Sequence, residues 1–235
     1  MRAVIDADTL AFAAASMAEG MDETQAHWNA ANSLDYLLAR VNNPSFTLYL
    51  TGENNFRYQI YPEYKANRRD TPRPAHLQSV KQFLVREYQA ILSDGCEADD
   101  LCGVDQCTTP DDTFIIHIDK DLDMIPGKHF SPEINRLGKT VREEREYYVS
   151  PGDALRTFYT QLLVGDPGDN VKGAKGIGKV KAERILEGLH DETDLYEAVR
   201  DYFSCDEELV LNGQVLWIWR EMNNIWKPPI ETSIK

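Results

Sequence analysis

Three short apolar runs of strand length alternate with longer segments whose apolar residues recur at helical spacing. The runs are Ala3–Ile5, Phe46–Leu50 and Thr113–Ile118. This alternation predicts an α/β fold, in which a mostly parallel central sheet is flanked by helices. Ligand sites in such sheets lie beyond the carboxyl ends of the strands. Asp6 and Asp119 each stand just there, which favours a role for both in a site.

The helical spacing divides the chain into two regions. One helical face before the second run consists of His27, Ala31, Leu34, Leu38 and Val41, and one after it of Leu77, Val80, Leu84, Tyr88 and Ile91. Beyond Val149 helices are expected at 155–162, 182–189 and 195–203. A last apolar stripe is more typical of core than of a partner surface: Val215, Ile218, Trp219 and Met222. We therefore expect an α/β core at 1–150 and a helical region at 151–235.

Eight carboxylates gather in four short clusters along the chain. They are Asp6; Glu97, Asp99 and Asp100; Asp119 and Asp121; Asp166 and Asp169. Like charges brought to one place repel, so such a group requires a compensating cation. Hard divalent cations such as Mg²⁺ take oxygen ligands, and an acid-lined two-metal site is the usual machinery of phosphodiester hydrolysis.

The cluster Glu97-Ala98-Asp99-Asp100 is expected to open a helix. Acids at that position also stabilise the helix through its dipole, which is a purely structural alternative. Capping explains one or two acids but hardly three, so we interpret the set as metal ligands.

Two familiar motifs are incomplete in this chain. The run from Asp119 to Asp123 begins like a calcium loop, but Met124 and Phe130 stand where that loop needs Gly and Glu, so this interpretation fails. The run from Gly173 to Lys179 matches most of a P-loop, but Val180 stands where Ser or Thr must reach Mg²⁺. An ATPase is therefore disfavoured.

A glycine-rich turn opening a helix is the better interpretation of that second motif. Glycines let backbone N–H groups approach a phosphate, and the helix dipole favours the anion. The turn contains Gly176 and Gly178 and is surrounded by Lys172, Lys175, Lys179 and Lys181. This arrangement suits sequence-independent binding of a DNA backbone.

A second basic segment lies within residues 52–74, which have no clean period and are rich in Arg, Tyr, Asn and Pro. A long connection of this kind is usually functional or mobile. Tyr64 could stack on exposed bases, and Lys65, Arg68 and Arg69 could neutralise phosphates. An ordinary solvated loop is the open alternative, as it is for the glycine-rich turn.

The composition suits a soluble globular protein, with 235 residues of which 42% are hydrophobic. No apolar run reaches the roughly 18 residues of a membrane span, and acids interrupt any signal peptide, so a cytoplasmic protein is expected. The four cysteines lack CxxC spacing, which disfavours a cysteine zinc site.

The net charge of −14 argues at first against a nucleic-acid partner. The clustered acids account for a good part of that charge, and bound metal would offset some of it.

Taken together, these segments resemble the 5′ nuclease superfamily, which comprises flap endonucleases, phage 5′→3′ exonucleases and the 5′ nuclease domain of bacterial DNA polymerase I. The resemblance runs from Asp6 to about Leu189, with the motifs in the family's order. They include Phe56-Arg57, Tyr64-Lys65-Ala66-Asn67-Arg68, Glu97-Ala98-Asp99-Asp100, Asp119-Lys120-Asp121-Leu122 and Gly165-Asp166-Pro167-Gly168-Asp169-Asn170. The last of these runs directly into the glycine-rich turn, and that combination is highly specific.

The resemblance implies a PIN-like sheet, a helical arch at 52–74 and a helix–turn–helix variant at 160–189. All eight carboxylates match the family's metal ligands, and Lys65 and Arg68 match the basic residues of its arch. The helix–turn–helix variant of the family grips duplex DNA and often holds K⁺. One departure is that Leu50-Thr51-Gly52-Glu53 lacks the Asp that usually ends the second strand, where Glu53 is the nearest substitute.

We therefore expect a 5′→3′ exonuclease or flap endonuclease with two Mg²⁺ or Mn²⁺ ions. It would act as a monomer on DNA, or on RNA–DNA hybrid, in replication or repair in a bacterial or phage-infected cell. A PIN-type ribonuclease would share the acids but would not need the glycine-rich turn. A non-catalytic DNA-binding replisome module would be expected to have lost the acids.

Overall fold

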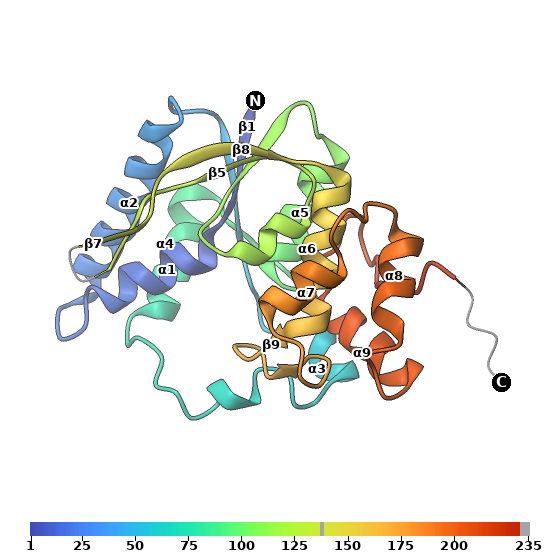
Figure 1. Ribbon diagram of the computed structural model, residues 1–235. Helices are drawn as coiled ribbons and strands as arrows, with labels where there is room; N and C mark the ends of the chain where they lie inside the picture. Colours follow the sequence, from blue (N-terminus) through green and yellow to red (C-terminus); the bar gives the residue numbers. More distant parts are fainter. Residues whose placement is uncertain (137–138, 231–235) are drawn as a thin grey trace.

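A six-stranded sheet forms the centre of the computed structural model, which describes residues 1–136 and 139–230 (Figure 1). The strand order is β3-β2-β1-β4-β5-β8. The strands are β1 (Arg2–Asp6), β2 (Phe46–Leu50), β3 (Ile91–Leu92), β4 (Thr113–Ile116), β5 (Gly127–Ser131) and β8 (Arg145–Val149). All neighbours pair in parallel except β5 and β8. The prediction of a mostly parallel sheet flanked by helices is confirmed.

Helices cover both faces of this sheet, and strand alternation decides which side chains meet them. Ile5 points into one apolar cluster with α1 (Ala7–Ser16), α2 (Glu23–Arg40) and α4 (Leu77–Tyr88). Its neighbour Val4 points into a second cluster, which includes residues of α5 (Ala98–Thr108) and α6 (Pro151–Val164). The first group of helices lies on one side of the sheet and the second on the other (Figure 1).

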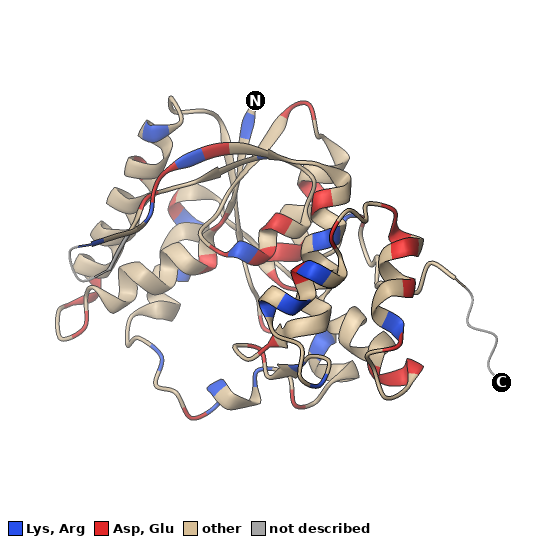
Figure 2. Cartoon of the chain, viewed as in Figure 1, with Lys and Arg blue, Asp and Glu red and all other residues tan. Residues whose placement is uncertain are grey.

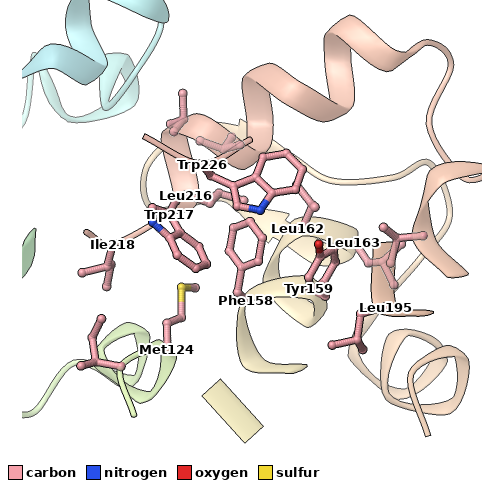
Figure 3. Close-up of a cluster of buried hydrophobic side chains, with 14 of the residues drawn as sticks. Met124, Phe158, Tyr159, Leu162, Leu163, Leu195, Leu216, Trp217, Ile218 and Trp226 are labelled. Atoms are coloured by element: carbon pink, nitrogen blue, oxygen red, sulfur yellow. The ribbon is translucent and has the colours of Figure 1, made fainter. Parts of the chain in front are cut away.

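The second cluster continues into the C-terminal helices α7 (Lys179–Ile185), α8 (Glu192–Arg200) and α9 (Asp206–Leu216). At its centre Phe158 packs edge-on against Trp217, with ring centroids 4.9 Å apart, and also contacts Trp226 (Figure 3). Val4 and Ile115 of the sheet belong to the same cluster. The two regions expected at 1–150 and 151–235 therefore share one core.

Several elements differ from those expected. The helix predicted to reach Ile91 ends at Tyr88, because Gln89 adopts a left-handed conformation (φ 57°) and Ile91 enters β3. The last apolar stripe was expected to run from Val215 to Met222, but α9 ends at Leu216. Within that stripe Trp219 is buried, whereas Met222 is exposed. Sequence reasoning did not predict α1, β3 or the strands after β4, among them the hairpin β6 (Ile134–Arg136) and β7 (Lys139–Arg142).

The segments expected to be an arch and a helix–turn–helix contain short elements. Residues 52–74 hold α3 (Phe56–Ile60) and the 3₁₀ helix η1 (Ala66–Arg68) and are otherwise irregular. Between α6 and α7 the chain forms a small hairpin, β9 (Gly165–Asp166) with β10 (Val171–Lys172), and then the glycine-rich turn. None of the described helices is long and apolar enough to cross a membrane.

Candidate active site

Parallel strand pairing places Asp6 and Asp119 at the same edge of the sheet. Ile5 lies opposite Ile116 in the β1–β4 register, and the two acids follow these positions. Each acid caps the element that follows it, accepting one hydrogen bond at 3.0 Å from the N–H of Asp8 or of Asp121. One oxygen of each carboxylate is thus fixed at a helix N-terminus. Asp6 caps α1, and Asp119 caps the 3₁₀ helix η2 (Lys120–Met124).

Asp99, in the first turn of α5, faces these two acids. Burial raises the pKa of the Asp99 carboxyl well above its ordinary value, and the charges of Asp6 and Asp119 raise it further. Burial likewise raises the pKa of Asp6 to about 7, with Asp8, Asp119 and Glu97 adding to the effect. No hydrogen bond or ion pair from residues 1–136 or 139–230 reaches the Asp99 carboxylate. A divalent cation would relieve this repulsion, so the donor set fits the hard metal ions that the sequence predicts.

Gln161 forms hydrogen bonds to two further carboxylates, those of Asp121 and Asp166. Its amide nitrogen lies 3.0 Å from Asp121 Oδ2 and 2.9 Å from Asp166 Oδ2. Burial, followed by the charge of Asp119, raises the pKa of Asp121 to about 6. The α6 side chain therefore ties the acid after β4 to the acid of the β9–β10 hairpin.

Glu97 and Asp169 are both contacted by side chains of the segment 52–74. The Tyr64 hydroxyl lies 2.7 Å from Glu97 Oε2 and 2.8 Å from Asp169 Oδ2. Lys65 Nζ lies 2.5 Å from Glu97 Oε1, and Arg68 donates to Asp169 Oδ1 at 2.7 Å. Burial acts to raise the pKa of Glu97, but the charges of Lys65 and Arg57 outweigh it and lower the pKa.

We call the seven carboxylates connected in this way the acidic cluster. They are Asp6, Glu97, Asp99, Asp119, Asp121, Asp166 and Asp169. Two basic side chains of the segment 52–74 pair with members of this cluster, Lys65 with Glu97 and Arg68 with Asp169. Lys120 Nζ lies 2.8 Å from Asp121 Oδ1.

Asp100, the eighth predicted ligand, has a different role. Its side chain is fully buried, and its two oxygens accept from both terminal nitrogens of Arg57, at 2.6 and 2.9 Å. They also accept from the N–H groups of Glu97 and Trp219. All the lone pairs of Asp100 are used, so we leave it out of the proposed ligand set. The bond to Glu97 is half of a capping box at the start of α5, the structural alternative considered for this motif.

Tyr64 was predicted to stack on bases, but its side chain is only 2% exposed. Its ring contacts Tyr58, and its hydroxyl joins Glu97 to Asp169. The physical reason for the error is that the aromatic ring belongs to the buried apolar core. Tyr64 is therefore removed from the DNA-contacting set and becomes a residue that supports the acidic cluster.

Asp8 is a site residue that sequence reasoning missed. It lies in the first turn of α1, accepts from the Thr51 N–H at 3.1 Å and pairs with Lys81 at 2.6 Å. Thr51 directly follows β2, where the sequence lacks the expected Asp, and Glu53 there is exposed. Asp8 thus brings a carboxylate to the end of β2 from the first turn of α1. Its position two residues after Asp6 was a signal that could have been used.

Comparison with known proteins identifies the family of the chain. The family described as 5′-3′ exonuclease, N-terminal resolvase-like domain, matches residues 3–141, more than half of the chain. The chain belongs to this family. Within it, residues 3–141 include five members of the acidic cluster, namely Asp6, Glu97, Asp99, Asp119 and Asp121.

Relatives in the family are mostly much longer than this chain. DNA polymerase I of Bacillus caldotenax is 27% identical over 180 residues, which is 68% of this chain but 20% of that protein. The 5′-3′ exonuclease of Halalkalibacterium halodurans is 26% identical over 198 residues, which is 74% of this chain and 61% of that protein. The chain thus spans about a fifth of the polymerase.

Solved structures share the fold at lower identity. The T5 D15 protein co-crystallised with metal ions is 18% identical, with a TM-score of 0.65 over 90% of this chain and 86% of that one. Human GEN1 in complex with Holliday junction DNA is 14% identical, with a TM-score of 0.59 over 96% of this chain and 62% of that one. The 5′ nuclease fold therefore extends over nearly all of the chain.

All but one of the remaining predicted residues lie beyond the matched 3–141. The glycine-rich segment, residues 172–181, carries Lys172, Lys175, Lys179 and Lys181, all of them exposed. Gly176 has φ +74° and open space around it, a conformation that favours glycine. Figure 2 shows basic residues along α7, which begins at Lys179. In the arch, Arg69 is exposed and donates to the Pro62 carbonyl.

Proposed function

We propose that the protein is a divalent-metal-dependent 5′ nuclease. It would hydrolyse DNA phosphodiesters at 5′ ends or 5′ flaps and leave 5′-phosphates. The observation that carries the proposal is the group Asp6, Asp99 and Asp119, three carboxylates that face one another where the sheet ends. Family membership supports the same reaction, because a relative that matches 74% of this chain is a 5′-3′ exonuclease.

The acidic cluster is the proposed binding site for two ions, Mg²⁺ or Mn²⁺. One part of this binding site would be formed by Asp6, Glu97, Asp99 and Asp119. The rest of the ligands would be Asp121, Asp166 and Asp169. Divalent metal ions are bound in the structure of the T5 5′-exonuclease, an 18% identical neighbour with TM-score 0.64. Such ions supply an activated water and stabilise the leaving oxygen.

Lys65 and Arg68 are the proposed catalytic cations of the chain. Burial acts to lower the pKa of Lys65, but Glu97 and Asp169 outweigh it, so the pKa is raised and the ammonium stays charged. The Lys65 N–H also donates to the Asp169 carbonyl at 2.9 Å, which fixes the arch to the 165–170 loop. Lys65 is thereby held beside the carboxylates, where a preorganised positive charge would stabilise charge developing on a phosphate.

Duplex DNA is the proposed partner of the glycine-rich segment. Exposed lysines and flexible glycines suit contacts to phosphates, which carry no sequence information. The catalytic core of Rad2, a neighbour with TM-score 0.52, was solved in complex with DNA substrate.

Four further properties stay predictions: K⁺ binding at the glycine-rich segment, action on RNA–DNA hybrids, a monomeric state and a cytoplasmic location. A role in replication or repair is supported by the similarity to DNA polymerase I.

The decisive experiment is incubation with 5′-labelled duplex, 5′-flap and RNA–DNA hybrid substrates, with Mg²⁺ and with EDTA. We expect Mg²⁺-dependent release of 5′-phosphorylated products, and the relative rates will separate exonuclease from flap cleavage. Cleavage of single-stranded RNA with no cleavage of any DNA substrate would instead identify a PIN-type ribonuclease. Binding of DNA without cleavage in Mg²⁺ or Mn²⁺ would identify a non-catalytic module.

A further inference from the structure

Four polar side chains converge at one point between the sheet and η2, outside the acidic cluster. His117 follows β4, His129 lies on β5, and Tyr147 pairs with His129 across the β5–β8 ladder. Asp123 joins them from η2. His117 and His129 are only 2% and 1% exposed, and Asp123 is partly exposed at the outer side of the group. Buried histidines this close together require a physical explanation.

Backbone carbonyls fix the tautomer of both rings. His117 Nδ1 is hydrogen-bonded to the Asp119 carbonyl oxygen, and His129 Nε2 lies 2.8 Å from the Ile125 carbonyl oxygen. A carbonyl oxygen can only accept, so these two nitrogens carry the protons. The other two nitrogens, His117 Nε2 and His129 Nδ1, are then lone-pair donors when the rings are neutral.

These two unprotonated nitrogens face each other at 3.1 Å. Two lone pairs at that separation repel unless a cation lies between them. Tyr147 has one hydroxyl proton for two acceptors, Asp123 Oδ1 at 2.6 Å and His117 Nε2 at 3.1 Å. The hydroxyl can therefore donate to only one of Asp123 and His117 at a time. Burial, reinforced by His117, lowers the pKa of His129 to about 4, which disfavours a proton there at neutral pH.

We propose that His117 Nε2, His129 Nδ1 and the Asp123 carboxylate bind a transition-metal ion, with Zn²⁺ the best match. Ligand atoms at 2.0–2.2 Å from a tetrahedral ion lie about 3.3–3.5 Å from one another. The separations here bracket that range, at 3.1 Å between the two nitrogens and 3.7 Å between His117 Nε2 and Asp123 Oδ1. All three ligand atoms lie within 4.8 Å of one another.

The surroundings support a soft or borderline ion at this position rather than Mg²⁺. Imidazole nitrogens suit Zn²⁺, Cu²⁺, Fe²⁺ and Ni²⁺, whereas Mg²⁺ requires oxygen ligands. Donation of the second ring N–H to a backbone carbonyl is the usual outer support of a metal-bound histidine. Arg145 lies 3.9 Å from Asp123 Oδ2, so Oδ1 remains directed toward the histidines. The Tyr147 hydroxyl or a water would supply the fourth ligand.

The site differs from the acidic cluster in its ligands but is mechanically connected to it. His117 holds the carbonyl of Asp119, whose carboxylate belongs to the cluster. Asp123 and Asp119 also lie at the two ends of one short turn. A bound ion would therefore stabilise the turn that positions Asp119, without taking any ligand from the nuclease site.

The test is a titration of metal-free protein with Co²⁺ and then Zn²⁺, in excess Mg²⁺ that saturates the carboxylates. We expect one equivalent of Co²⁺ to produce the intense visible absorption of a tetrahedral ion and Zn²⁺ to abolish it. H117N and H129Q retain an N–H that can reach the same backbone carbonyl but lose the facing nitrogen. Each should weaken Zn²⁺ binding by about 100-fold or more, beyond the 10–100-fold cost of losing an outer partner.

D99N is the matched control, because it alters the acidic cluster and leaves all the proposed zinc ligands in place. It should retain the Co²⁺ absorption. Absence of a tetrahedral band in the wild-type protein would overturn the proposal without any variant, as would a band that H117N and H129Q both retain while folded by circular dichroism. A weak, six-coordinate Co²⁺ spectrum lost in D99N would assign the ion to the acidic cluster instead. The zinc readout does not depend on cleavage, so its failure is separable from failure of the nuclease proposal.

Discussion

The acidic cluster and the glycine-rich segment have opposite charges and are held in opposite ways. The carboxylates are partly or fully buried. Asp6, Asp119 and Asp166 accept hydrogen bonds from backbone N–H groups, and Gln161 and Tyr64 link four members of the cluster. The lysines are exposed, and those with contacts make loose ones, such as Lys179 with Glu183 at 3.8 Å. Rigid placement suits chemistry, in which a small displacement is costly. Mobile charge suits binding to a backbone of varying position. The two regions should therefore fail in different ways when changed.

The largest expected effect comes from Asp119→Asn in the acidic cluster. The variant keeps the cap of η2 but removes a charge from the proposed metal ligands. Cleavage in Mg²⁺ should fall by roughly 10³-fold, the upper end of the cost of losing one preorganised electrostatic group, while circular dichroism stays unchanged. Asp111→Asn, an exposed acid at the other end of β4, should leave the rate unchanged. Near wild-type cleavage by Asp119→Asn would remove this cluster from the mechanism.

A second prediction contrasts two adjacent acids of α5. Asp100→Asn removes the charged partner of buried Arg57, and breaking such a pair costs about 3–5 kcal/mol of unfolding free energy. Asp99→Asn removes a carboxylate that repels its neighbours, so the metal-free protein should be equally or more stable. Denaturant unfolding in EDTA measures both. Equal destabilisation by the two variants would mean that Asp99 also has a structural role.

These two acids also show where sequence reasoning reached its limit. Continuous apolar runs identified β1, β2 and β4, and the acids at the carboxyl ends of β1 and β4 followed from strand polarity. Short or polar strands were missed, because Ile91-Leu92 is too short to show a period and β5 contains Lys128 and His129. Nothing in Glu97-Ala98-Asp99-Asp100 distinguishes Asp99 from Asp100. Only the tertiary approach of Arg57 and Trp219 does so. The roles of Tyr64, Gln161 and Asp8 likewise depend on contacts between distant segments.

Lys65 tests whether the arch belongs with the chemistry or with binding. Its ammonium lies beside Glu97 and 3.8 Å from Asp169, so Lys65→Ala removes positive charge from within the cluster. Single-turnover cleavage of a 5′-flap substrate should fall by about 10²-fold, with a much smaller change in the binding isotherm. Lys128→Ala, an exposed lysine of β5, serves as the control. A loss confined to affinity would place Lys65 with the glycine-rich segment instead.

The smallest effect is expected from Lys175→Ala combined with Lys179→Ala, and it should appear in binding alone. Each lysine that contacts a phosphate releases about 0.9 counterion, so the slope of log K against log salt should flatten by about 1.8. Cleavage at saturating substrate should change by less than about threefold, because neither lysine reaches the acidic cluster in the described structure. The pair Lys128→Ala and Lys227→Ala makes the same change of net charge at exposed positions outside the segment. If both pairs flatten the slope equally, the effect is one of overall charge. If the first pair flattens it and the second does not, the glycine-rich segment is the duplex contact, and the division between rigid chemistry and mobile binding holds.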